Sequence, residues 1–147
     1  VSHLSGTVGA AMEGLYHGLP AIAVSEDPNS ENTAITAKFT ADLVDRYRRL
    51  GAPNGTMISI NVPAGELKGV AVRPMGDSYL STARYAPTIR DAMTTDYESV
   101  RIIVDSQDST TDTYAYQQGY ISVTPLKFDW TDLEMLDEVE SWNLQID

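Results

Sequence analysis

Hydrophobic residues recur at helical spacing in the middle of the chain. Between residues 31 and 50 they are separated by three or four positions and comprise Ile35, Phe39, Leu43, Tyr47 and Leu50. This spacing places them on one stripe and predicts an amphipathic helix. Ser30 is the expected N-cap, and Gly51 marks the expected end of the helix.

Two more helices are predicted nearer the ends of the chain. Residues 5–17 are rich in small side chains and contain no proline, and Gly18 followed by Pro20 ends the segment. Residues from about 132 to 142 form the second helix. Its apolar stripe consists of Met135, Val139, Trp142 and Ile146.

Strand signals lie between and after these helices. Residues 57–63 alternate, with isoleucine and valine on one side and Ser59 and Asn61 on the other, which is typical of a strand with one buried face. The other predicted strands are 21–25, 69–73, 100–104 and 120–128, the last being either a strand pair or one strand broken at Pro125. The alternation of helix and strand predicts an α/β fold whose first strands are parallel.

Residues 74–110 fit this regular pattern least. Residues 74–98 are polar, contain Pro74, Gly76 and Pro87, and carry several tyrosines. We interpret them as a long loop or a protruding arm. Tyr79, Tyr85 and Tyr97 are candidates for an aromatic base-stacking surface, although protein contacts are the more usual role of tyrosines on an arm.

Composition narrows the classes of function. The formal net charge of −11 should repel nucleic-acid phosphates and anionic membranes, so no nucleic-acid partner is expected. No apolar run approaches the roughly 20 residues that span a bilayer, and no secretory leader is visible. The absence of cysteine excludes disulfides and thiolate metal sites and suits a reducing compartment. A cytoplasmic protein with no membrane partner is therefore expected.

The start of the first predicted helix is the strongest candidate for a binding site. Ser5, Gly6 and Thr7 open this helix, and the N–H groups at a helix N-terminus form a favourable site for an anion. The alternative is a capped helix that binds no ligand.

Several stretches of the chain follow one another in a recognisable order and spacing. They are Ser5–Gly14, Gly18–Ser25, Ile58–Pro63, Leu67–Val70, Thr111-Asp112 and Gly119–Leu126. Together they resemble the SurE family of metal-dependent survival-protein nucleotidases and phosphatases. The resemblance is specific over residues 4–25, 56–73 and 111–131, and it is poor over residues 74–110.

The resemblance implies a phosphohydrolase that acts on nucleoside monophosphates or other phosphomonoesters. In that family the Ser-Gly-Thr motif helps hold the phosphate, so Ser5, Gly6 and Thr7 become phosphate-binding candidates and Ser5 a catalytic one. The family's Asp-Asp pair, serine and asparagine bind Mg²⁺ or Mn²⁺. No such set can be nominated in this chain, which resembles the C-terminal part of the family protein. The alternative is therefore a catalytically inactive fragment or an oligomerisation module.

The resemblance also implies a fold and an assembly. The expected fold is the C-terminal part of a Rossmann-like three-layer α/β structure forming a single domain over residues 1–147. An extended β-hairpin over residues 74–110 would form the arm. A C-terminal helix within residues 132–147 would be exchanged between subunits of a homodimer or homotetramer.

The remaining polar candidates have plainer interpretations. His3 lies close to Ser5 and is a weak candidate for proton transfer, whereas His17 suits the C-terminal end of its helix. Glu13 is expected to be structural. Asp112 is expected to cap the helical turn that follows it, with a role in the pocket as the second choice. Adjacent acids at Glu26/Asp27 and Asp137/Glu138 are expected to be solvated, and Asn54-Gly55-Thr56 to be a turn.

Overall fold

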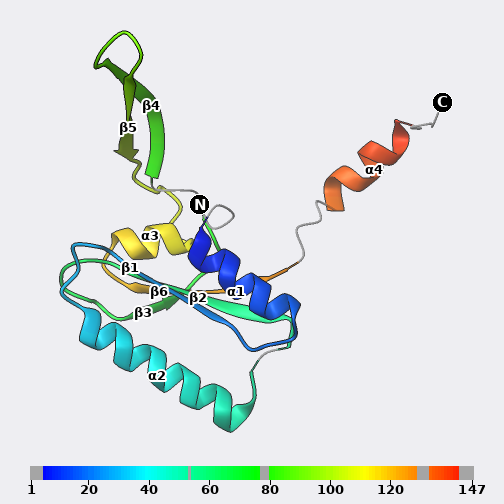
Figure 1. Ribbon diagram of the computed structural model, residues 1–147. Helices are drawn as coiled ribbons and strands as arrows, with labels where there is room; N and C mark the ends of the chain where they lie inside the picture. Colours follow the sequence, from blue (N-terminus) through cyan, green and yellow to red (C-terminus); the bar gives the residue numbers. More distant parts are fainter. Residues whose placement is uncertain (1–4, 53, 77–79, 129–132, 143–147) are drawn as a thin grey trace.

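The structure, a computed structural model, describes residues 5–52, 54–76, 80–128 and 133–142 (Figure 1). Its helices and strands follow the predicted order, with a hairpin in the least regular region. In chain order they are α1 (Gly6–Tyr16), β1 (Ile22–Glu26), α2 (Thr33–Leu50), β2 (Thr56–Val62), β3 (Val70–Val72), β4 (Leu80–Ile89), β5 (Thr95–Ile103), α3 (Asp112–Gln117), β6 (Ile121–Lys127) and α4 (Leu133–Ser141).

A four-stranded mixed sheet forms the centre of the protein. Its strand order is β1-β2-β6-β3. Strands β1 and β2 are parallel, as the sequence predicts, and β3 is parallel to β6. Strand β6 runs antiparallel to β2. Helices α1 and α3 cover one face and α2 covers the other, which gives three layers (Figure 1).

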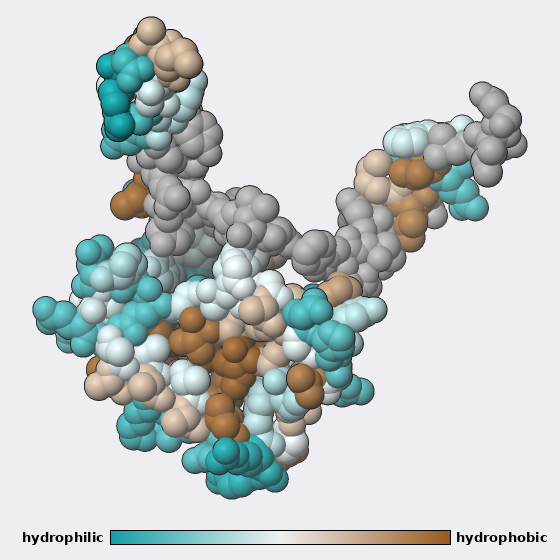
Figure 2. Space-filling view, in the orientation of Figure 1, coloured by the Kyte–Doolittle hydropathy of each residue, from teal (hydrophilic) through white to brown (hydrophobic). Residues whose placement is uncertain are grey.

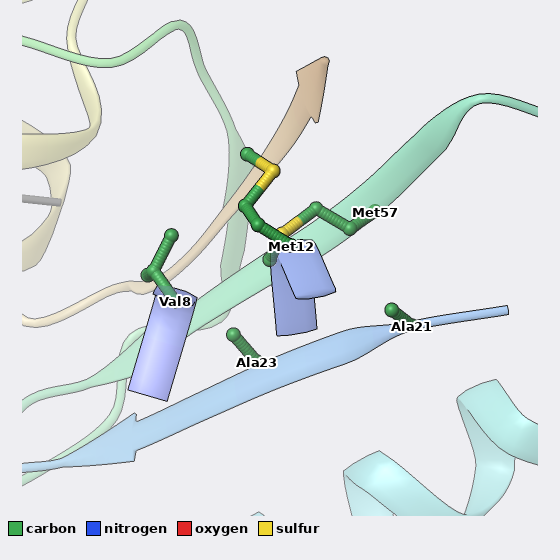
Figure 3. Packing of buried hydrophobic residues seen from close by; sticks show 5 residues of the cluster. All are labelled: Val8, Met12, Ala21, Ala23 and Met57. Atoms are coloured by element: carbon green, nitrogen blue, oxygen red, sulfur yellow. The ribbon is translucent and has the colours of Figure 1, made fainter. Parts of the chain in front are cut away.

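The face beneath α1 is packed by small and flexible side chains. Val8 and Met12 of α1 contact Ala23 of β1, Ala21 just before that strand, and Met57 of β2 (Figure 3). Met57 is completely buried. Because the alanines have short side chains, the helix lies close to the strand; an ideal Cβ at Gly14 would be 3.8 Å from the Ala21 Cβ.

The opposite face of the sheet packs against α2. Ile60, Val62 and Ile121 are its buried centre, and Phe39 and Leu43 of the predicted stripe pack against them. The predicted N-cap of α2 is wrong. The cap is Asn32, whose side-chain amide donates instead to the carbonyl oxygens of Pro63 (3.1 Å) and Gly65 (2.9 Å). Ser30 accepts from the Asn32 N–H at 3.0 Å.

Strand β6 continues through Pro125, so the predicted break there is wrong. In this strand the N–H of Ile121 donates to Gly69, and the carbonyl oxygen of Val123 accepts from Arg73. Residues 121, 123 and 125 therefore point their backbone groups toward β3. Strand β3 ends at Val72, opposite Val123. The N–H that proline lacks would thus face a position beyond the end of β3, where the sheet requires no donor.

The region of weakest pattern contains a hairpin. Strands β4 and β5 pair antiparallel from Leu80↔Ile103 to Ile89↔Thr95, with a register shift between Thr82 and Arg84. Strand β5 is thus longer than the predicted strand at 100–104. Figure 1 shows the hairpin projecting from the sheet, with α4 also standing away from it.

Helix α4 keeps part of its apolar stripe exposed. Met135, Val139 and Trp142 are all at least one-third exposed. Figure 2 shows hydrophobic and hydrophilic residues on different sides of this helix. Among the described residues no helix is both long and apolar enough to cross a membrane.

Candidate functional site

The N-terminus of α1 has the geometry expected of a capped helix. The backbone of Ser5 is extended, with φ −81° and ψ 121°, and its hydroxyl accepts from the Val8 N–H at 3.4 Å. Gly6 and Thr7 lie in the first turn and are exposed. N–H groups in a first turn point out of the helix because no preceding turn supplies their acceptors. The three predicted residues are therefore adjacent at the positive end of α1.

The direction of α1 brings this end to the carboxyl edge of β1. Near the start of the strand, Gly14 lies against Ala21, whereas Val8 and Ala23 belong to the same core cluster further along. Figure 3 shows Val8 toward the arrowhead of β1 and Ala21 near its beginning. Helix and strand are therefore antiparallel. In open α/β sheets the carboxyl edge of the strands is the usual place for a ligand.

A row of polar residues crosses the sheet at the same level. Ser25 of β1 is paired with Asn61 of β2, and Asn61 is paired with Ser122 of β6. Residues paired across strands share a face, and Ser25 lies two positions beyond Ala23, so this row faces the α1 side. Ser122 is 1% exposed, and its hydroxyl has no hydrogen-bond partner among the described residues.

Sequence reasoning missed this polar row. The alternation in β2 places Asn61 opposite the isoleucines, but it does not identify the residues beside Asn61. The row exists because the antiparallel register of β6 brings Ser122 next to a strand that precedes it by about 60 residues in the sequence.

The two acids at the end of β1 are not simply solvated, contrary to the prediction for Glu26 and Asp27. Asp27 accepts from the Tyr116 hydroxyl of α3 at 3.1 Å and from the Asn29 N–H at 2.9 Å. Glu26 accepts from the Thr33 hydroxyl at 3.2 Å. Both carboxylates therefore fix loops at the carboxyl edge.

The pKa of Glu26 lies below its ordinary value of 4.5. The hydroxyl of Ser30 is the largest cause, and the donors of Thr36, Thr33 and Asn32 add to it, while partial burial opposes the shift. Hydrogen bonds to a carboxylate favour its charged form and so lower its pKa.

We expect the stability contributed by Glu26 to depend on pH. A carboxyl group whose pKa is lowered on folding stabilises the protein fully above its unfolded-state pKa. That contribution disappears as the pH falls through the folded-state pKa. Glu26→Gln should therefore unfold at lower urea concentration than the parent at pH 7, and the difference between the two should narrow as the pH falls below the ordinary pKa of 4.5. Glu31→Gln, at an exposed position nearby, is the matched control; an equal, pH-independent loss in both variants would contradict the prediction.

Asp112 does not cap α3, so the prediction for this residue is wrong. Thr111 is the N-cap, and its hydroxyl accepts from the Tyr114 N–H at 3.4 Å. The Asp112 carboxylate instead accepts from the Gly76 N–H at 2.7 Å and from the Thr124 hydroxyl at 3.3 Å. The reason is tertiary: these two donors come from segments distant in sequence.

The described residues do not fit a metal centre. No group of three or more histidine, cysteine, aspartate or glutamate side chains is placed to hold a metal ion within them. The carboxylates that lie at the carboxyl edge and beside α3 already accept hydrogen bonds from protein donors. A hard divalent cation needs several converging oxygen ligands, and these side chains do not converge.

The other candidates separate into structural and undescribed residues. His17 is the C-cap of α1 and lies 3.1 Å from the Glu13 carboxylate, so both belong to the helix surface. Asn54 and Gly55 form the predicted turn, with Gly55 at φ 64°. Tyr97 is 68% exposed on β5. The predictions for His3, Tyr79 and the side chains of Tyr85 and Asp137 fall outside the described residues.

Comparison with protein families and curated proteins identifies relatives with a shared name. The family model of the survival protein SurE matches residues 1–82. The 5′-nucleotidase SurE of Thermoanaerobacter sp. (strain X514) is 34% identical over 150 residues, covering 97% of this chain and 58% of its own length. The 5′-nucleotidase SurE of Symbiobacterium thermophilum is 36% identical, covering 95% and 56%.

A solved structure agrees with these sequence matches. The crystal structure of the SurE protein from Aquifex aeolicus superposes with a TM-score of 0.73 at 30% identity, and the match covers 95% of this chain and 58% of that one. The chain therefore spans somewhat more than half the length of the relatives that it matches.

Proposed function

The chain belongs to the SurE family, and on that basis we propose that the intact protein releases phosphate from nucleoside 5′- or 3′-monophosphates. Curated relatives over nearly the whole chain are named 5′-nucleotidases, so the family contains enzymes. The observation that carries the proposal is the position of Ser5, Gly6 and Thr7 at the positive end of α1, beside the carboxyl edge of β1.

In this proposal the N-terminal turn of α1 forms the phosphate-side wall of the site. The N–H groups of Gly6 and Thr7 donate to phosphoryl oxygens, and the Ser5 hydroxyl is close enough to add a third donor. Donors fixed in this way stabilise the negative charge of the phosphoryl group during transfer and need no rearrangement at that moment. Ser5 is the catalytic candidate because its hydroxyl is only weakly engaged, at 3.4 Å, by its own helix.

The proposed reaction depends on a divalent metal, Mg²⁺ or Mn²⁺, in the intact protein. Such an ion activates an oxygen nucleophile and offsets charge on the phosphoryl group when bound. We place its ligands outside the residues described in the structure. The alternative is that this chain alone is a catalytically inactive fragment or an oligomerisation module.

Assembly and location remain predictions. A homodimer or homotetramer would use the arm within residues 74–110 and the helix within 132–147 as contacts. The exposed apolar residues of α4 support such a use, because isolated amphipathic helices gain most of their stability by packing. A cytoplasmic location and a phosphomonoester substrate complete the proposal.

Substitution of Ser5 tests the phosphate site in the intact protein. Ser5→Ala should lower turnover of a nucleoside monophosphate about 10- to 100-fold, because one hydrogen bond to a charged group is lost. Loss of the cap should lower the free energy of unfolding by only about 1 kcal/mol. Ser5→Asp separates the role of Ser5 in phosphate binding from its role as a helix cap. Aspartate caps a helix as well as serine does, so stability should be retained while its charge repels the phosphate.

The measurements are phosphate release with and without Mn²⁺ and urea unfolding of the same preparations. Ser109→Ala, an exposed serine in a loop, is the matched control. Full turnover in Ser5→Asp would show that Ser5 is only a cap. The same assay on the 147-residue chain decides between the proposal and the alternative. Metal-dependent release by this chain alone would mean that a complete site lies within its residues.

A further inference from the structure

Helix α3 lies beside the two segments that join the β4–β5 hairpin to the body of the protein. We call these segments the legs of the hairpin: the first follows β3 and the second follows β5. It contains only six residues, Asp112–Gln117, and leads directly into β6 at the centre of the sheet. The polar side chains of α3 make hydrogen bonds to the segments on either side of the hairpin.

The first leg, which follows β3, is held by Asp112. The Asp112 N–H donates to the Pro74 carbonyl oxygen at 2.9 Å, and the Asp112 carboxylate accepts from the Gly76 N–H at 2.7 Å. The other carboxylate oxygen accepts from the hydroxyl of Thr124, on β6, at 3.3 Å. One side chain thus ties the root of the first leg to a central strand.

The second leg, which follows β5, is held by Gln117. The amide nitrogen of this side chain donates to the Val104 carbonyl oxygen at 2.8 Å, and its amide oxygen accepts from the Ser106 N–H at 2.8 Å. Both ends of one side-chain amide therefore bind the backbone, much as a neighbouring strand would. Val104 immediately follows the last residue of β5, so the hydrogen bonds of Gln117 begin where the hairpin ends.

The two roots also meet each other through the cap of α3. The Ser106 and Thr111 hydroxyl oxygens are 3.5 Å apart. Gly76 approaches Thr111 so closely that an ideal Cβ at Gly76 would lie 2.5 Å from the Thr111 Cβ. A glycine on one leg and a serine on the other thus contact a single buried threonine.

The helix that holds the legs is itself fixed to the sheet. The Tyr116 hydroxyl donates to the Asp27 carboxylate at 3.1 Å, and the Asp27 N–H donates to the Val62 carbonyl oxygen at 2.9 Å. Asp27 follows β1, and Val62 ends β2. Ala115 of α3 is buried. Helix α3 is thus attached at the same carboxyl edge of the sheet toward which the N-terminus of α1 points.

We propose that α3 is a clamp that fixes the direction of the β4–β5 hairpin relative to the carboxyl edge of the sheet. Asp112 and Gln117 are its positioning residues, one for each leg. A hairpin joined to a domain by two unsupported chains would sample many directions, because each freely rotating residue adds conformational entropy. The hydrogen bonds of Asp112 and Gln117, both on one anchored helix, remove that conformational freedom where the two legs leave the body.

The absence of cysteine allows a direct measurement of hairpin direction. Met93, 96% exposed at the hairpin tip, and Leu50, 74% exposed at the end of α2, can each be replaced by cysteine and spin-labelled. Electron–electron double resonance on the full chain, diluted with unlabelled chain to suppress signals between copies, then reports the spread of tip-to-body distances. We expect a narrow distribution in the parent and a broader one in Gln117→Ala and in Asp112→Ala.

Gln118→Ala is the matched control, because the neighbouring glutamine is exposed and follows the same helix. Its distance distribution should equal that of the parent. Gln117→Glu keeps the acceptor for Ser106 and loses the donor to Val104, so it tests the hydrogen bonds of Gln117 if the alanine variant folds poorly. Hydrogen exchange gives a second readout: the Ser106 amide should exchange about tenfold faster in Gln117→Ala and retain its rate in Gln118→Ala.

Three results would overturn the clamp. The first is a parent distance distribution already as broad as that of the variants, and the second is an unchanged distribution in the Gln117 and Asp112 variants. The third is equal broadening in Gln118→Ala, which would mean that general weakening of α3 is responsible.

Discussion

Replacing Met57 by alanine should lower the free energy of unfolding by about 2–5 kcal/mol. Met57 is completely buried between β2 and α1, where it contacts Val8 and Met12. The other members of this cluster are Ala21 and Ala23, whose short side chains cannot extend into the space left behind. The loss should therefore combine the transfer free energy of the missing atoms with a cavity term. Urea unfolding monitored by circular dichroism measures it.

Met93→Ala is the matched control for this substitution. Met93 is 96% exposed at the tip of the hairpin, so its removal should change the free energy of unfolding by no more than about 0.5 kcal/mol. Equal effects of the two substitutions would show that α1 does not pack on the sheet in solution. The candidate phosphate site would then lose its support as well, since it depends on where α1 points.

Replacing Gly76 by alanine should lower the free energy of unfolding by about 1–3 kcal/mol through overpacking. An added Cβ would lie 2.5, 2.7 and 2.8 Å from the Cβ, Oγ1 and Cγ2 atoms of Thr111. Thr111 cannot easily turn away, because its side chain is β-branched and its hydroxyl donates to the Asp108 carbonyl oxygen at 2.9 Å while capping α3. Relief of the overlap would have to shift the cap or the root of the hairpin.

A second glycine provides a control of opposite sign. Gly9 lies inside α1, and an ideal Cβ there would have no heavy atom within 4 Å. Gly9→Ala should therefore raise the free energy of unfolding by up to about 1 kcal/mol, because alanine loses less backbone entropy in a helix. Thermal unfolding of both variants gives the comparison. Stabilisation by Gly76→Ala would mean that Gly76 does not lie against Thr111.

The order of helices and strands in the body could be read from the chain, because each depends on local pattern. The stripe through Phe39 and Leu43 identified α2, and the alternation around Asn61 identified β2. The parallel pairing of β1 with β2 followed from the helix between them. Local pattern failed where a distant partner decides the outcome: Pro125 is tolerated only because β3 ends before reaching it.

The residues of the candidate site were likewise identified from the sequence only in part. Ser5, Gly6 and Thr7 were identified from sequence because a helix start is encoded by adjacent residues. Their role in binding phosphate remains a prediction. The polar row through Ser25, Asn61 and Ser122 was not identified, because strand register is set by packing of the whole sheet.

By itself the sequence determined the α/β class, the course of the amphipathic helices and the family to which the chain belongs. These depend on periodicity and on motifs whose residues are neighbours, so the information is local. Only the tertiary structure decided that Asp112 binds Gly76 and Thr124 and that Gln117 holds the second leg of the hairpin. These contacts form when strands distant in the chain are paired, and a polar side chain then bonds to whichever backbone group folding leaves beside it.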